Sequence, residues 1–339
     1  HNSTISLNYL LNILMPYLTA NTLDAIVVDF TSHCNSMCGN CSRNLGGVKV
    51  NPLMPLSHMT MKTWKNIIDN ATTNEIIFNG SYGDPLMNPI LVEALEYAAS
   101  EDIQIMIHTN GGIGVPEQYV ALANVLKKFK QPSGITWSID GLEDTNHLYR
   151  RGVIWERIMN NAKAFIQAGG KARWRMLVFD HNAHQLEECE QLSKDMGFLK
   201  FDVNGGFAFT ALNSMVDNAI EKFKENKKDK ARVIKYDSKH LDHIERLEKI
   251  KDFSDTTIKC KWQNKRKIQI NHVGEVLPCC YLLSDRWPKD INSPYAKQQK
   301  DVVWPNVNDK SLTDIIEGEE LLMPSKNRFK ICEVTCGEM

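Results

Sequence analysis

The sequence predicts an α/β protein, a partial (β/α)6 barrel that is TIM-like but has six strands instead of eight, followed by a small α+β module. Short apolar runs alternate with helical patterns from about residue 24 to residue 210, as expected for parallel strands joined by helical crossovers. Eight of the nine cysteines lie in two groups, three between residues 34 and 41 and five between residues 260 and 336. The second group lies C-terminal to the part of the sequence that shows the barrel pattern.

The barrel elements follow one another in order. Six runs have the composition of buried strands: 25–30, 75–78, 103–108, 134–139, 173–179 and 199–203. Helical patterns lie between them, at about 60–70, 89–101, 117–130, 154–168 and 184–197. In barrels of this kind the loops that follow the strands carry the chemistry. We therefore expect the functional residues directly after the strand ends.

The chain is predicted to have four parts: an N-terminal extension 1–23, the barrel 24–214, a charged helical linker 215–258 and the small module 259–339. The linker is expected to be exposed, because residues 221–251 mix basic and acidic side chains with few apolar ones. A basic surface for a polyanionic partner is the alternative. In the module, residues 268–278 predict a hairpin turning at Gly274, and Ser311 is expected to cap a short helix over 311–316.

Bulk composition argues against several kinds of partner. The formal net charge of −1 gives no reason to expect nucleic acid or an anionic membrane. No apolar run approaches the ~18 residues of a membrane span, and residues 10–18 lack the features of a signal peptide. Clustered cysteines without a secretory signal are more often metal-binding than disulfide-bonded. We expect a cytoplasmic protein with two metal sites.

Cys34, Cys38 and Cys41 follow the first predicted strand in one tight loop. Three such thiolates can hold an iron–sulfur cluster, although zinc also uses closely spaced cysteines. The spacing, three intervening residues and then two, resembles that of the radical S-adenosylmethionine (radical SAM) superfamily. The resemblance implies a 4Fe-4S cluster on these cysteines, with one iron left open for the methionine part of S-adenosyl-L-methionine.

Two later segments also resemble this superfamily. Residues 79–85 (NGSYGDP) resemble a Gly-Gly-Glu-Pro element that follows the second strand and contacts the cofactor's amino group. Residues 138–141 (SIDG) resemble the ribose-contacting segment after the fourth strand. Either segment alone is also an ordinary turn. The resemblance implies these cofactor contacts: Tyr82, Gly83, Asp84, Pro85, Ser138 and Asp140.

Tyr82 and Asp84 replace the first Gly and the Glu of the Gly-Gly-Glu-Pro element, and one position of the cysteine loop also departs from the superfamily pattern. The residue before the third cysteine is usually aromatic and packs near the adenine, whereas this chain has Asn40. Adenine recognition is therefore expected to use other groups as well. Asn110, at the end of the third predicted strand, is a candidate lining residue and is equally well explained as a polar turn residue.

The C-terminal cysteines resemble the auxiliary-cluster module called SPASM. The order of Cys260, Gly274 and Cys279 is similar to the start of that module, and Cys332 and Cys336 would complete four ligands. The full SPASM form uses more cysteines for two clusters. Because this chain has fewer before its last residue, the shortened Twitch form with a second 4Fe-4S cluster is expected.

Structural zinc is the alternative for this module, since four cysteines also suit tetrahedral zinc. Cys280 is not needed among the four ligands. It could replace Cys279 as a ligand, supply a thiol near the active site, or be a buried cysteine without a role at the cluster. Cys189 is expected in the core, because it lies on a helical pattern with apolar spacing.

The resemblance implies an enzyme that cleaves S-adenosylmethionine to a 5′-deoxyadenosyl radical, which removes a hydrogen atom from the substrate. An external donor of the flavodoxin or ferredoxin type would supply the electron. The substrate is either a small molecule, which is dehydrogenated or rearranged, or a ribosomally made peptide. Only about two dozen residues precede the first strand, which leaves no room for a peptide-recognition domain and favours a small molecule or a peptide bound without one.

Candidate substrate-facing residues lie at and after the fifth strand: Arg173, Arg175, Asp180 and His181. An arginine pair on one strand face can hold a carboxylate or phosphate. Residues 281–310 are expected to form either a lid or irregular packing around the second cluster. The alternative from another class is a non-catalytic iron–sulfur or zinc protein that binds or senses, but such a protein would need no cofactor-contacting segments.

Overall fold

The computed structural model describes residues 23–205 continuously, together with parts of the C-terminal region: 257–258, 260, 262, 265–284, 286–287, 302–318, 321, 332 and 337–338. The predicted N-terminal extension lies almost wholly outside these residues. The predicted linker 215–258 also lies outside them, apart from its last two residues.

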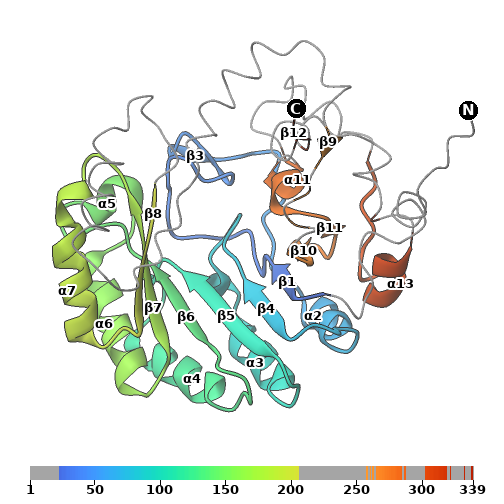
Figure 1. Ribbon diagram of the computed structural model, residues 1–339, viewed down its shortest axis with the longest axis horizontal. Helices are drawn as coiled ribbons and strands as arrows, with labels where there is room; N and C mark the ends of the chain where they lie inside the picture. Colours follow the sequence, from blue (N-terminus) through green and yellow to red (C-terminus); the bar gives the residue numbers. More distant parts are fainter. Residues whose placement is uncertain are drawn as a thin grey trace, which may run out of the picture.

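An eight-stranded sheet organises the described residues, in the order β11-β10-β1-β4-β5-β6-β7-β8 (Figure 1). Every neighbouring pair from β10 to β8 is parallel, and β11 is antiparallel to β10. The first six strands of this sheet in chain order, from β1 to β8, confirm the predicted ones to within two residues at each end. The strands are β1 (Ala25–Val28), β4 (Glu75–Phe78), β5 (Gln104–Thr109), β6 (Gly134–Ser138), β7 (Ala172–Val178), β8 (Lys200–Gly205), β10 (Lys267–Ile270) and β11 (Val276–Leu277).

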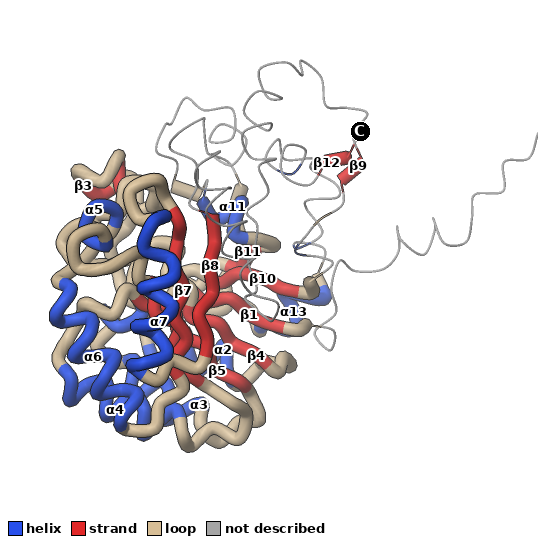
Figure 2. The backbone as a smooth tube through the Cα atoms, turned by 60° about the vertical axis from the view of Figure 1, so that its left-hand side comes forward, coloured by secondary structure: helices blue, strands red, loops and turns tan. Residues whose placement is uncertain are grey.

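Helices connect these strands and lie along the outer face of the curved sheet (Figure 2). They are α2 (Met61–Ile68), α3 (Leu91–Ala98), α4 (Pro116–Leu126), α6 (Trp155–Gln167) and α7 (Leu186–Met196). Alternate strand residues face the helices, and the core there includes the fully buried rings of Trp64, Trp137 and Trp174. This architecture confirms the predicted partial barrel. None of the described helices combines the length and the apolar character that crossing a membrane requires.

The predicted C-terminal hairpin is confirmed and belongs to the barrel sheet. Ile270 pairs with Val276 across the hairpin and with Val28 of β1 on its other side. Gly274 lies in the turn with a φ of 90°, and a Cβ there would lie 2.6 Å from Asn306 Oδ1. This hairpin of the C-terminal region therefore extends the barrel sheet.

Shorter elements complete the described residues. Two small two-stranded sheets pair β2 (Asn44–Leu45) with β3 (Lys49–Val50), and β9 (Thr257–Ile258) with β12 (Gly337–Glu338). Ser311 caps helix α13 (Leu312–Glu317) by accepting a hydrogen bond from Asp314 N at 3.1 Å, as expected. Helices α5 (Asn146–Tyr149) and α11 (Cys280–Ser284) and the short helices η2 (Pro85–Met87) and η3 (Ala183–Gln185) lie in the connections.

Candidate functional site

Cys34, Cys38 and Cys41 lie in the loop after β1, at the carboxyl end of the parallel strands. None of the three forms a disulfide; Cys38 is buried and the other two are partly exposed. Ser36 N donates to Cys34 Sγ at 3.3 Å, and Ser36 Oγ lies 3.0 Å from Cys38 Sγ. These contacts orient two of the three sulfur atoms before any metal is bound.

The thiol of Cys34 is strongly disposed to keep its proton. Burial, the negative charge of Asp84 and the neighbouring thiols of Cys38 and Cys41 raise the pKa of Cys34 to about 12, against a hydrogen bond from Ser36 N that lowers it. Thiolate is the form that binds metal, so metal binding here must release a proton.

The segment 79–85 packs directly against the cysteine loop. A Cβ at Gly83 would lie 2.4 Å from Thr31 O and 2.6 Å from His33 O, which only glycine tolerates. Asp84 N donates to His33 O at 2.9 Å. Ser81 O lies 3.8 Å from Cys41 Sγ. The second-strand segment and the first cysteine loop thus form one continuous backbone layer.

The carboxylate of Asp84 ties this layer to the end of β5. Both of its oxygens accept from Thr109 Oγ1 at 2.9 Å, and Oδ2 also accepts from Asn110 N at 2.8 Å. Burial raises its pKa to about 6, although these hydrogen bonds oppose the shift. Asp84 also caps η2, which begins at Pro85. Its side chain therefore positions two strand ends.

Asn110 brings the third strand end into the same site. Its Nδ2 donates to Asn35 Oδ1 at 2.7 Å and lies 3.8 Å from Cys34 Sγ. Its Oδ1 accepts from Gly112 N at 2.8 Å. The side chain of Asn110 is thus held against the cysteine loop, next to the sulfur of the first ligand candidate.

The side chain of Tyr82 faces a different part of the molecule. It is fully buried, its hydroxyl donates to Leu283 O, and its ring lies 5.2 Å from that of Trp287. It belongs to an apolar cluster that also contains Cys279 and Cys332. At this position only the backbone remains for a cofactor contact.

Asp140 is fully buried, and both of its oxygens are engaged within the protein. Oδ1 accepts from Leu177 N at 2.7 Å, and Oδ2 forms an ion pair with Arg150 Nε at 2.7 Å. Burial raises its pKa, and Arg150 is the strongest opposing influence. Ser138 ends β6 and is half-buried.

Arg173 and Arg175 lie on the inner face of β7, on the side of the sheet that carries His108. Burial, with Arg175, Arg173 and Lys267 nearby, lowers the pKa of His108 to about 3. His108 Nδ1 lies 3.2 Å from Asn79 Oδ1. The inner face of the barrel is therefore polar and partly cationic.

Asp180 and His181 follow β7 at the carboxyl edge. Asp180 is exposed, whereas His181 is half-buried and stacks on Phe179 at 5.2 Å. Phe179 in turn packs 4.5 Å from Tyr149. Burial is the main cause that raises the pKa of Tyr149, followed by the nearby thiol of Cys38. An aromatic row therefore runs from His181 toward the cysteine loop.

Sequence reasoning missed Asp29, which lies beneath the site. Its carboxyl group is fully buried and accepts from Ser81 N at 2.8 Å and from Gln269 Nε2 at 2.5 Å. Burial raises its pKa to about 7. Tyr149 and Arg150 were missed as well. Their signal in the sequence was weak, since both lie in the connection between β6 and α6, whereas Asp29 directly follows an apolar strand.

Cys279 and Cys332 lie in the second apolar cluster, and Cys260 and Cys280 lie near Cys279. Burial and the nearby thiols of Cys280, Cys332 and Cys260 raise the pKa of Cys279. Three of the four predicted ligands therefore lie near one another, and Cys336 lies outside the described residues. Cys280 is partly exposed, and burial and the nearby Asp29 raise its pKa to about 11. Cys189 is fully buried in the main core, as expected.

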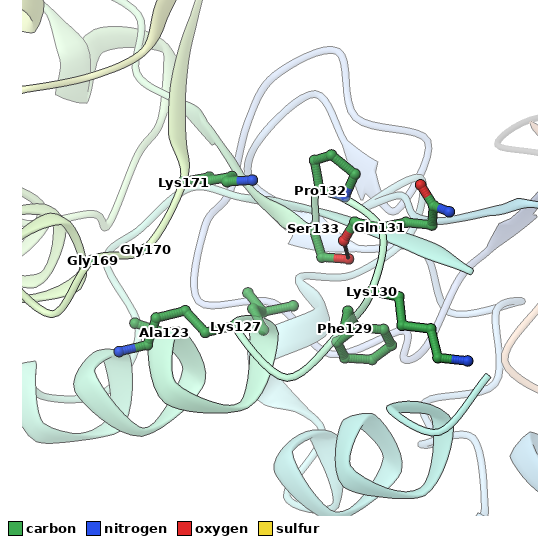
Figure 3. Close-up of a pocket in the computed structure, with 11 residues that line it drawn as sticks. Ala123, Lys127, Phe129, Lys130, Gln131, Pro132, Ser133, Gly169, Gly170 and Lys171 are labelled. Carbon is green, nitrogen blue, oxygen red and sulfur yellow. Dashed lines mark hydrogen bonds between the residues drawn. The ribbon is translucent and has the colours of Figure 1, made fainter. Parts of the chain in front are cut away.

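A surface pocket of about 170 Å³ lies at the opposite end of the sheet, formed by residues 131–133 and 169–171 before β6 and β7 (Figure 3). Lys127, Lys130 and Lys171 line it, and Lys127 Nζ donates to Ala168 O at 2.9 Å. Because the cysteines follow the carboxyl ends of the strands, this pocket is remote from their site.

The thiol groups of the first loop fit an iron–sulfur cluster. Among the described residues, no three His, Cys, Asp or Glu side chains are placed around a single metal ion. A four-iron cluster instead takes each cysteine sulfur on a different iron. The three thiols after β1 are the donor set that such a cluster uses, with one iron left for another ligand.

Comparison with known families gives two matches. Residues 28–196 match the family described as the Radical SAM superfamily. Residues 260–337 match SPASM, described as an iron-sulfur cluster-binding domain. The first match runs from the last residue of β1 to the end of α7, and the second begins at Cys260 and includes the other C-terminal cysteines.

A curated relative and several solved structures are also similar. The AdoMet-dependent heme synthase of Methanosarcina barkeri is 24% identical over 183 residues, which are 52% of this chain and about half (49%) of the relative's length. Streptococcus suis SuiB bound to S-adenosylmethionine has a TM-score of 0.60 at 15% identity, covering 93% of this chain and 72% of SuiB. The enzyme anSMEcpe with bound AdoMet has a TM-score of 0.57 at 15% identity, covering 92% of this chain and 84% of anSMEcpe. At such low sequence identities, the similarity to these structures supports the fold and nothing further.

Proposed function

Because the chain belongs to the radical SAM superfamily and carries a SPASM-type iron–sulfur domain, we propose that Cys34, Cys38 and Cys41 hold a 4Fe-4S cluster that cleaves S-adenosyl-L-methionine reductively. Such a cluster, when reduced, supplies the electron that releases methionine and a 5′-deoxyadenosyl radical, which then takes a hydrogen atom from the substrate. The observation that carries the proposal is the placement of the three thiols beside the ends of β4 and β5.

The chain's own residues have distinct parts in this proposal. The backbone of Tyr82 and Gly83 follows Ser81, whose carbonyl oxygen lies 3.8 Å from Cys41 Sγ, and can there meet the amino group of the cofactor's methionine part. Asp84 and Pro85 hold that backbone in place through η2 and the end of β5. Asn110 lines the site beside Cys34.

On the ribose side, the partly exposed Ser138 is the better candidate for a direct contact. The carboxylate of Asp140 is occupied by Leu177 N and Arg150. We therefore infer that Asp140 orders the end of β6, while its segment presents Ser138 and the backbone to the ribose. Tyr149 and Phe179 provide apolar surface near Cys38 that can cover the adenine where Asn40 cannot.

We propose further that Cys260, Cys279, Cys332 and Cys336 hold a second 4Fe-4S cluster. The closeness of the first three supports this assignment, as does the match to an iron–sulfur cluster-binding domain. Four thiolates leave no iron open, so this cluster would serve electron transfer or stability. It would occupy an apolar setting, since Tyr82, Leu282 and Trp304 surround its cysteines.

For the substrate we propose a peptide. SuiB has been solved bound to the precursor peptide SuiA, with a TM-score of 0.59 to this chain, and anSMEcpe with the peptide Kp18Cys, at 0.57. The cationic inner face around Arg173 and Arg175 suits a carboxylate of such a peptide. A small molecule is the second candidate, because the curated relative is named a heme synthase.

The test is anaerobic reconstitution with iron and sulfide, followed by dithionite and S-adenosylmethionine. We expect 5′-deoxyadenosine from the wild type and none from Cys34→Ser, Cys38→Ser or Cys41→Ser. Cys189→Ala is the matched control, since that thiol lies in the main core away from both groups. A wild type that binds iron yet forms no 5′-deoxyadenosine with several reductants would sink the proposal and leave the binding or sensing alternative.

A further inference from the structure

A small two-stranded ribbon covers part of the first cysteine loop. Its strands β2 and β3 are joined by the turn 46–48, and a Cβ at Gly47 would lie 2.8 Å from Met37 O and 3.0 Å from Gly39 Cα. Arg151 O accepts from Met37 N at 2.9 Å, and Arg151 Nη1 donates to Gly47 O at 3.4 Å. The ribbon turn and Arg151 are therefore the immediate neighbours of the backbone around Cys38. Figure 2 shows β3 next to α5 at the carboxyl edge of the sheet.

The ribbon of β2 and β3 and the segment after it expose apolar side chains to solvent. Val48, at the ribbon turn, is 81% exposed, and Leu53 and Leu56 further along the same segment are about half exposed. Lys49 and Arg151 are exposed beside Val48. An exposed apolar side chain beside two cations can be complemented by a partner surface that is acidic and partly apolar.

The charge of this region has one sign. Residues 30–68 include four lysines and arginines and no aspartate or glutamate, and residues 145–155 likewise hold Arg150 and Arg151 without an acidic residue. Asp144 and Glu156 border the second stretch. Arg150 is already paired with Asp140, and Arg43 is buried and bonded to Ser32 O and Asn44 Oδ1.

Lys49 and Arg151 are thus cations that face solvent at the cysteine loop. Neither forms an ion pair with a residue in the described part of the chain. We propose that this surface, which consists of Val48, Lys49 and Arg151, docks a small acidic one-electron carrier protein of the flavodoxin or ferredoxin class.

The proposal rests on the proposed function, because it needs a redox-active cluster at the first cysteine loop. One electron leaves the reduced carrier, which is oxidised by one electron, and enters that cluster, which is reduced by one; no bond forms or breaks. The docked carrier would lie close to this cluster, because the ribbon turn and Arg151 contact the backbone of Met37, the residue before Cys38. An acidic partner is favoured because opposite charges steer association and raise its rate.

The experiment uses the full-length, cluster-loaded chain and fully reduced flavodoxin or ferredoxin as the probe, in anaerobic stopped flow at low and high salt. The test variant is Lys49→Glu/Arg151→Glu. The control is Lys130→Glu/Lys171→Glu, which changes the net charge by the same amount at the pocket on the opposite end of the sheet (Figure 3). Reduction by dithionite, a small anion that needs no docking surface, is measured on the same samples.

We expect the carrier-driven rate of the test variant to fall about tenfold or more at low salt and to lose its salt dependence. Its iron content and its dithionite-driven rate should stay within about twofold of the wild type, and the control should behave as the wild type does. If the double variant loses iron, Val48→Glu takes its place, since this substitution removes no hydrogen bond. The carrier-driven rate is again compared with the dithionite-driven rate.

Equal losses in the test and control variants would overturn the proposal, as would a wild type that neither carrier reduces. A variant that keeps its carrier-driven rate but binds a peptide substrate more weakly would assign the surface to the substrate and also overturn it. A wild type without a dithionite-reducible cluster would overturn the proposed function itself, which the iron and dithionite measurements reveal separately.

Discussion

Asp29 joins the barrel to the C-terminal hairpin through a carboxyl group that is disposed to stay neutral. Its two oxygens face Ser81 N and the Gln269 side chain, and Gln269 Oε1 is buried without a partner among the described residues. A protonated Asp29 can donate to that oxygen if the amide of Gln269 turns over. The thiol of Cys280 is the nearby titratable group whose own pKa Asp29 raises.

Because of this residue, the free energy of unfolding should decrease as the pH is raised. The pKa of an aspartate in an unfolded chain is taken as 3.8, and that of Asp29 in the folded protein is about 7. Between these values the folded chain keeps a proton that the unfolded chain has released, so raising the pH favours unfolding, by at most about 1.4 kcal/mol per pH unit. In Asp29→Asn we expect a smaller decline of the Tm from pH 5 to pH 8 than in the wild type. Asp102→Asn, an exposed carboxylate, is the control, and an unchanged profile in Asp29→Asn would contradict the expectation.

Tyr82 links the first site to the second through one hydrogen bond. Tyr82→Phe removes the hydroxyl and leaves Leu283 O without this buried donor, which should cost about 1–3 kcal/mol of unfolding free energy. We expect a lower urea midpoint and faster labelling of Cys279 by a thiol reagent in the cluster-free protein. Tyr97→Phe, whose hydroxyl bonds to Asp69 at the surface, should change little. Equal labelling of Cys279 in both variants would argue against the link.

At the residue scale, the sequence predicted the side chains that carry a recognisable spacing and missed those defined by distant partners. Cys34, Cys38 and Cys41 stand close together in the chain, so their loop could be read directly. Asp29 acquires its properties from Ser81 and Gln269, the latter 240 positions away. No local pattern indicates such a pairing.

At the scale of elements, the loop after β4 depends on a glycine that backbone atoms surround. Gly83→Ala would place a Cβ 2.4 Å from Thr31 O, and a backbone oxygen cannot move aside as a flexible side chain can. We expect the cysteine loop to shift, with lower iron content and weaker binding of S-adenosylmethionine in equilibrium dialysis.

The matched control for this variant is Gly39→Ala in the cysteine loop, where an added Cβ would meet no described atom of another segment within 4 Å. Iron content in Gly83→Ala equal to that of the control would show that the close packing of segment 79–85 on the cysteine loop is not needed for the site.

The barrel strands and helices were predictable because each carries its own periodic pattern. The runs at 134–139 and 173–179 are apolar enough to be read without a partner, and the observed β6 and β7 match them. The pairing of β10 with β1 was not predictable, since a strand of four residues gives no information about its neighbour. The short ribbon of β2 and β3 was missed for the same reason.

At the scale of the whole molecule, the two groups of cysteines lie in different surroundings, and the second apolar cluster contains Cys279 and Cys332. Removing the second group should therefore leave the first intact. In Cys279→Ser/Cys332→Ser we expect iron to fall from about eight to about four per chain, with 5′-deoxyadenosine still formed under dithionite. Elemental analysis for iron and zinc is the measurement, and four iron with one zinc in the wild type would support structural zinc instead.

The division of the chain into parts was only partly accessible to sequence reasoning. The composition changes near residue 215 and again near residue 259, but composition does not reveal that Lys267–Ile270 joins the sheet of the barrel. The segment 281–310, predicted to form either a lid or irregular packing around the second cluster, includes residues 288–301, which lie outside the described residues. Its described ends, at Trp287 and Trp304, pack in and around the cluster that contains Cys279.

The seating of β10 beside β1 also has a consequence for biosynthesis. The backbone of β1 leaves the ribosome long before its neighbour, since Asp29 and Gln269 are 240 residues apart. At about 5–20 residues per second, that interval lasts about ten to fifty seconds. During this time β1 is an edge strand of the nascent barrel, and its unpaired amide and carbonyl groups can bind another extended chain. Ribosome-associated chaperones should therefore engage this protein until its last strands are translated.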